Sequence, residues 1–104
     1  MKHLKVMWNH NHKEEPSIIY QEIDDSSYEI RKIEIMKDGQ VIGYASEAGE
    51  FGESILADQQ IPTIEKINQE DEFIAEEITR IEFENAWNSA VSKYHKKQQL
   101  QNEN

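Results

Sequence analysis

The sequence predicts an α+β domain, with an antiparallel β-sheet of about four strands and a C-terminal α-helix packed on one face. Three observations support this prediction. Alternating apolar residues fill much of the first half of the chain, an Asp-Gly turn joins two of these segments, and an amphipathic helical pattern lies near the C-terminus. The length of 104 residues suits a single domain, which we place at residues 1–97 and follow with a polar tail at residues 98–104.

Two segments near the N-terminus alternate as half-buried strands do. In residues 3–10, Leu4, Val6 and Trp8 share one face of an extended chain. Residues 17–24 alternate in the same way. We therefore expect both segments to pair in the sheet.

Residues 28–46 are predicted to form a β-hairpin. Asp38 and Gly39 supply the positive φ angles that a tight two-residue turn requires. Within the first strand, the apolar residues at 28 and 30 have one parity and those at 33 and 35 have the other. Either a bulge near Arg31 or Lys32, or partial burial of both faces, would explain this change.

The next segment loses its periodicity. Residues 47–60, "EAGEFGESILADQQ", contain two Gly and several acids, and are predicted to form an exposed loop. Residues 61–69 then place Pro62 at the start of a possible short helix.

The C-terminal helix is predicted to begin at a capping box made by Thr79 and Glu82. Ile78 and Phe83 occupy the positions of a hydrophobic staple across this cap. The helix has one apolar stripe, formed by Phe83, Trp87, Ala90, Val91 and Tyr94, which we expect to cover the sheet. Beyond about Lys97 the chain is polar and should fray.

Composition limits the cellular setting. The chain has no Cys, which excludes disulfides and thiolate metal sites and suits a reducing compartment. The N-terminal residues lack the apolar run of a secretory signal, and no segment approaches the ~20 apolar residues of a membrane span. We expect a cytoplasmic protein that does not contact the membrane.

Negative charge is concentrated in the middle of the chain. Residues 1–46 contain eight acids and six bases, residues 47–84 contain twelve acids and two bases, and residues 85–104 contain one acid and three bases. The middle segment therefore accounts for the whole net charge of −10. A solvated acidic face would explain this distribution. A field of one sign would also attract a basic partner and repel nucleic acid, so we expect no direct binding to DNA or RNA.

No catalytic motif is present. The sequence lacks a G-x-S-x-G elbow and a phosphate-binding glycine loop, and its many carboxylates have no accompanying nucleophile. His10 and His12, with Glu14, are the only candidates for metal ligands, and two His in a polar turn are more often solvated. We expect neither enzymatic activity, nor a metal, nor another cofactor.

Successive blocks of the chain resemble a family of small bacterial proteins. The blocks are "LKVMWNH", "EEPSIIYQEID", "YEIRKIEIMKDG", "GYASE", "IPTIEKIN" and "EEITRIEFENAW", which together cover residues 3 to about 91. The family includes CdiI-like immunity proteins of contact-dependent growth inhibition systems. This chain has the residues of the family pattern at the positions that we expect to support the fold, namely Trp8, His10, Pro16, Tyr20, Arg31 and Gly39.

The resemblance implies a function in toxin immunity. Many toxins of such systems are nucleases, whose active sites must be basic to hold a phosphate backbone. We expect this protein to bind a cognate basic toxin domain as a 1:1 heterodimer and block its cleft, an RNase being favoured over a DNase. The expected partner-binding residues are Glu47, Glu50, Phe51, Glu53, Ile55, Leu56, Asp58, Glu70, Asp71 and Glu72. The alternative is an acidic interaction module or complex subunit unrelated to immunity.

Overall fold

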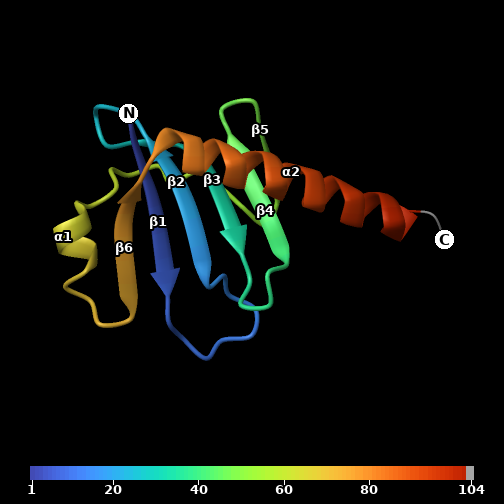
Figure 1. Ribbon diagram of the computed structural model, residues 1–104, viewed down its shortest axis with the longest axis horizontal. Coiled ribbons are helices and arrows are strands. Elements are labelled where there is room, and N and C mark those ends of the chain that lie inside the picture. The colour runs from blue at the N-terminus through green and yellow to red at the C-terminus, as the bar shows by residue number, and fades with distance from the viewer. Residues whose placement is uncertain (103–104) are drawn as a thin grey trace.

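The protein is an α+β domain built on one antiparallel sheet. The computed structural model describes the backbone of residues 1–102 and the side chains of residues 1–100. In chain order the elements are β1 (Lys2–Trp8), β2 (Ile18–Ile23), β3 (Glu29–Ile35), β4 (Val41–Ser46), β5 (Gly49–Gly52), α1 (Ile64–Ile67), β6 (Phe73–Ile78) and α2 (Arg80–Asn102). The strands lie in the order β5-β4-β3-β2-β1-β6 (Figure 1). The described residues thus form a sheet of six strands, and the expected number of about four is too low.

The two additional strands are the edges of the sheet. β5 has four residues, two of them Gly, and was predicted to be part of a loop. β6 pairs with β1, so that Val6 lies opposite Ala75, although the two strands are far apart in the sequence. The sequences of β5 and β6 have no strong local preference for the extended state. Each segment becomes a strand mainly because it pairs with its neighbour in the sheet.

The first strand of the β3–β4 hairpin contains the expected bulge. Glu22 of β2 lies opposite Arg31 and the next residue, Ile23, lies opposite Glu29, so the register passes over Ile30. The bulge brings Glu29 and Lys32 to the same face, where Lys32 Nζ lies 3.0 Å from Glu29 Oε1. Both faces of the sheet are also partly covered, so both explanations of the parity change hold.

The turn of this hairpin is one residue longer than predicted. The Met36 N–H donates to the carbonyl of Gln40 at 2.8 Å, which leaves three residues in the loop. Only Gly39 in this loop has a positive φ, at 90°. Asp38 accepts a hydrogen bond from the Gln40 N–H at 3.0 Å. The loop is therefore a three-residue connection with Gly in the left-handed position.

α2 crosses one face of the sheet, as predicted (Figure 1). At its start the Thr79 hydroxyl accepts from the Glu82 N–H at 3.0 Å and donates to the Glu82 carboxylate at 3.2 Å. This cap satisfies one exposed amide of the first turn. Of the expected stripe, Phe83 and Ala90 are buried in the core cluster that also contains Ile33, Val41 and Tyr44, and partly buried Trp87, Val91 and Tyr94 pack against it.

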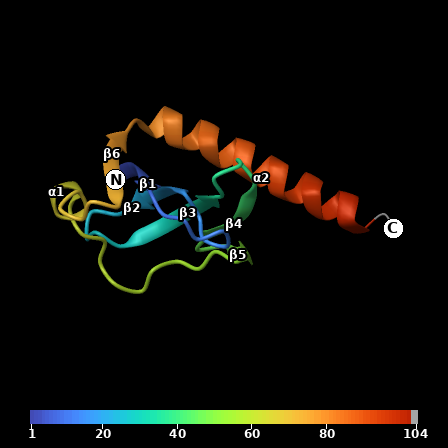
Figure 2. The same cartoon turned by 90° about the horizontal axis from the view of Figure 1, so that it is seen from below.

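The other face is partly covered by α1 and by residues 53–63, which we call the strap. The strap passes beneath the sheet on the side away from α2 (Figure 2). Ser54 is fully buried and its hydroxyl donates to Glu34 at 2.7 Å, while the Ala57 N–H donates to Glu29 at 2.9 Å. The prediction of an exposed loop at 47–60 is therefore wrong for β5, which pairs in the sheet, and for buried Ser54, whereas most of residues 53–60 are exposed and irregular as predicted.

Gly43 permits the close approach of the strap and β5. A Cβ atom at this position would lie 2.5 Å from the Phe51 carbonyl oxygen and 2.6 Å from the Ser54 hydroxyl. No side chain fits at such distances, so glycine is required where β4 meets this connection.

The second half of α2 continues past the sheet (Figures 1 and 2). The helix extends to Asn102, so the described residues of the expected tail, 98–102, are helical, and residues 103–104 lie outside the described chain. Polar helix formers such as Gln98 and Gln99 allow this extension without a packing partner. Neither described helix is both long and apolar enough to cross a membrane.

Candidate functional site

All but one of the acids of the middle segment are exposed and lack a cationic partner among the described residues. Of the twelve acidic residues between 47 and 84, eleven are exposed, and Glu84 is half-buried. Glu84 is also the one member of this group that forms an ion pair within the described residues, through Arg31. The negative charge of this segment is therefore directed into solvent, where it acts on other molecules.

The fold divides the predicted site between the two edges of the sheet. Glu47, Glu50, Phe51 and Glu53 lie at or beside β5, whereas residues 70–72 lie directly before β6. Because β5 and β6 are the outermost strands, the sheet separates these two groups rather than joining them. The strap, with Ile55, Leu56 and Asp58, connects the two edges across the face opposite α2 (Figure 2).

Around β5, part of the predicted site has a structural function. The Glu50 carboxylate accepts a hydrogen bond from the Leu56 N–H at 3.1 Å, which ties the strap to the edge strand. Phe51 stacks on buried Tyr44 with ring centroids 4.8 Å apart, and it keeps 39% of its surface exposed. Ile55 is 67% exposed. Phe51 and Ile55 remain accessible to a partner, whereas Glu50 and half-buried Leu56 help to hold the fold.

At β6, the backbone edge is closed by a side chain. The Asn68 amide donates to the Ala75 carbonyl at 3.0 Å and accepts from the Ala75 N–H at 2.6 Å, as a neighbouring strand would. Glu72 accepts a hydrogen bond from the Trp8 indole at 3.1 Å, which leaves Glu70 and Asp71 without hydrogen-bonded side-chain partners among the described residues. At Ala75 this edge therefore offers no free backbone groups, and the acids before β6 present charge to a partner.

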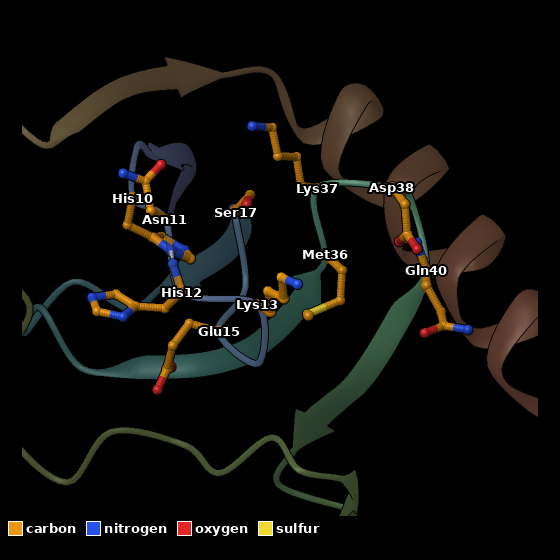
Figure 3. Close-up of a pocket in the computed structure, with 10 residues that line it drawn as sticks. All are labelled: His10, Asn11, His12, Lys13, Glu15, Ser17, Met36, Lys37, Asp38 and Gln40. Atoms are coloured by element: carbon orange, nitrogen blue, oxygen red, sulfur yellow. Dashed lines mark hydrogen bonds between the residues drawn. The ribbon is translucent and has the colours of Figure 1, made fainter.

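A polar cleft of about 410 Å³ lies between the β1–β2 loop and the β3–β4 turn. Its side chains, among them His10, His12 and Lys37, do not converge on one point (Figure 3). His10 Nδ1 accepts from the His12 N–H at 2.9 Å, so Nε2 carries the proton and donates to the Pro16 carbonyl at 2.7 Å. Both ring nitrogens of His10 therefore form hydrogen bonds within the β1–β2 loop and are not free to bind a metal. No group of three potential metal ligands occurs within the described residues.

The polar network around Arg31 was not predicted from the sequence. Arg31 Nε and Nη2 donate to the Glu22 carboxylate at 2.6 and 2.9 Å, and Arg31 also binds Glu84 of α2. His3 Nε2 lies 2.8 Å from the second oxygen of Glu22. The network links β1, β2, β3 and α2, so no local sequence pattern indicates it.

Hydrogen bonds from Arg31 explain the electrostatics of this network. They lower the pKa of Glu22, and they lower the pKa of Glu84 in the same way. The hydrogen bond to Glu22 raises the pKa of Arg31 in turn. The guanidinium carbon lies 4.8 Å from the Phe83 ring and 5.0 Å from the Trp87 ring. Because its N–H groups are bonded to Glu22 and Glu84 and two aromatic rings lie against it, Arg31 fastens the helix to the sheet and is not free to bind a ligand.

Comparison with known proteins identifies a family but no activity. Residues 2–92 match Domain of unknown function (DUF6881), a span that runs from β1 into α2 and includes both acidic edges. No curated protein and no solved structure is significantly similar to the chain. The family description assigns no function, so the functional argument depends on the surface of the molecule. Because the match covers most of its length, the chain belongs to the DUF6881 family.

Proposed function

We propose that the protein is an immunity protein that binds and neutralises a basic toxin domain, with a nuclease as the toxin class. The observation that carries this proposal is the group of eleven exposed acids in residues 47–84, none of which has a cationic partner within the described chain. Such a field raises the association rate of a basic partner and disfavours partners that carry phosphate.

The mechanism is occupation of the toxin's active-site cleft. A nuclease holds the phosphate backbone with Lys and Arg, and these side chains repel one another until an anion neutralises them. Exposed carboxylates such as Glu47, Asp58 and Glu70 can supply that charge without chemistry of their own. Long-range attraction governs the encounter, and apolar contacts at the centre of the interface slow dissociation.

A second function is supported by the same charge. The acids could serve a subunit of another complex, with a basic partner that is not a toxin. Part of the charge also protects the sheet edges from pairing with other chains, because charged side chains on edge strands oppose aggregation. This protective effect requires no partner, so only a binding experiment separates it from the proposed function.

Co-expression tests the proposal. The protein is produced together with the product of the gene immediately upstream of its own, and growth and co-purification are measured. We expect the upstream product alone to arrest growth, and co-expression to restore growth and give a stable complex. An upstream product that is harmless, or that fails to bind, would contradict immunity. A complex with a non-toxic basic protein would favour the alternative function.

A further inference from the structure

An apolar groove of about 400 Å³ lies on the face of the sheet opposite α2. Val6 of β1 and Ile19 of β2 project from this face, and Ile67 of α1 and Phe73 of β6 also line the groove. The strap contributes Ile61 and Pro62. The volume falls within the range of about 300–1,000 Å³ that is usual for ligand pockets.

The groove exists because α1 is too short to cover this face. α1 has four residues, and none of them is buried. Leu4, Val6, Ile23 and Ala75 are buried in this second core, whereas Ile19, Ile67 and Phe73 are only partly buried around it. A contiguous apolar surface left open in this way marks a site of contact with another molecule.

The polar residues of the groove determine which partner fits. Glu70 lines the groove, and Asp71 and Glu72 follow it along the chain, whereas Lys66 is the one cation in the lining. Gln21 also lines the groove, and its amide N–H donates to Glu29 at 2.5 Å. The groove therefore combines an apolar interior with a charged end, where the acids of residues 70–72 outnumber Lys66.

We propose that this groove receives a basic segment of the partner, with an apolar side chain inserted between α1 and the sheet and Lys or Arg side chains near Glu70. This inference rests on the proposed function and adds the location of its anchor. It places the centre of the interface on the face opposite α2, where the strap, with Asp58 and exposed Ile55, borders the same surface. Apolar anchors enclosed by charged rims are the usual arrangement of binding hot spots.

Methyl NMR with short peptides tests the groove without the natural partner. The first peptide, acetyl-KKLFKK-amide, has both the apolar pair and the bases. Acetyl-KKGGKK-amide lacks the apolar pair, and acetyl-EELFEE-amide has the opposite charge. We expect the first peptide to shift the methyl signals of Val6, Ile19 and Ile67, and to bind about tenfold more tightly than either control.

Two matched variants control for charge and folding. Glu70→Lys reverses an acid in the groove lining, and Glu76→Lys reverses another exposed acid, in β6, whose position lies opposite Lys5, outside the groove. We expect Glu70→Lys to weaken binding of the first peptide about tenfold and Glu76→Lys to change it by less than about twofold. Both positions are exposed, so both variants should remain folded.

Three results would overturn the inference. The peptide could shift the methyl signals of Ile81 on α2 instead of those of the groove, bind equally well without its apolar pair, or respond equally to the two variants. Methyl shifts that depend on protein concentration in the absence of peptide would assign the groove to a second copy of the chain. Any of these results would leave the co-expression test unaffected, so the groove and the immunity function can fail separately.

Discussion

Replacement of Arg31 by Met tests how the helix is held on the sheet. The substitution removes the hydrogen bonds to Glu22 at 2.6 and 2.9 Å, the contact with Glu84 at 3.3 Å, and the cation–π contacts with Phe83 and Trp87. The Glu22 side chain is only 8% exposed, so its charge would be left in the interior with His3 as its remaining partner. Loss of one member of a buried ion pair costs about 3–5 kcal/mol.

We expect the lower end of this range, about 3 kcal/mol, because the Arg31 side chain is 20% exposed and water can partly replace it. Urea unfolding measures the loss, provided that the m value stays constant. Arg31→Lys is the matched control, since it keeps the charge and loses the planar double contact with the Glu22 carboxylate. Its unfolding free energy should lie between those of wild type and Arg31→Met. A loss below about 1 kcal/mol for Arg31→Met would refute the fastening role of this network.

The pH dependence of stability in wild type and Arg31→Met gives a second test of the network, and its direction can be predicted. Arg31 lowers the pKa of Glu22 and of Glu84 below the ordinary value of 4.5. Stability from these groups is therefore fully present above about pH 4.5 and is lost as the pH falls through the lower folded pKa values. The difference in unfolding free energy between wild type and Arg31→Met should shrink as the pH falls below about 4.5. Parallel stability curves would contradict the assignment.

Two further predictions concern the core and the sheet edge. Phe83→Ala should lower the unfolding free energy by about 3–5 kcal/mol because Phe83 is fully buried. Ile81→Ala, at a position 73% exposed, should change it by less than about 0.5 kcal/mol. Equal effects of the two substitutions in thermal or urea unfolding would mean that the buried face of α2 is misassigned. Asn68→Ala should free the N–H and carbonyl of Ala75 and promote association through β6. Light scattering that shows the same mass for wild type and variant at all concentrations would remove the edge-closing role of Asn68.

The helix and its buried face could be predicted because their pattern is local. Phe83, Trp87 and Tyr94 recur at helical spacing, and that spacing alone puts them on one side. The central strands alternate clearly for the same reason. The edge strands could not be predicted, since residues 73–78 become a strand only through pairing with β1, and the Gly residues of β5 give no extended preference.

The candidate site could be predicted in composition but not in position. The acids from Glu47 to Glu72 form one charged region in the sequence, and the fold distributes them over both edges of the sheet, the strap and α1. The groove is formed by side chains from three strands, α1 and the strap, and the Arg31 network joins four elements. Sites of this kind depend on contacts between distant segments, which hydrophobic periodicity does not encode.

Two variants with the same net charge can separate the effect of the exposed acids on association from the effect of net charge. The first neutralises acids along the strap and both edges through Glu47→Gln, Asp58→Asn and Glu70→Gln. The control adds three bases at exposed positions of α2 through Asn85→Lys, Asn88→Lys and Ser92→Lys. Each variant changes the formal net charge from −10 by three units in the same direction.

The most direct test of the proposed function is the association rate of wild type and both variants with the upstream gene product. The rate is measured by stopped flow at about 0.02 M and about 0.5 M salt, where screening lengths differ several-fold. The account predicts that the wild-type rate falls at least about tenfold at the higher salt, and that neutralising the three acids slows association at low salt much more than the α2 control does. A rate that is independent of salt, or equal effects of the two variants, would contradict recognition through the acidic surface.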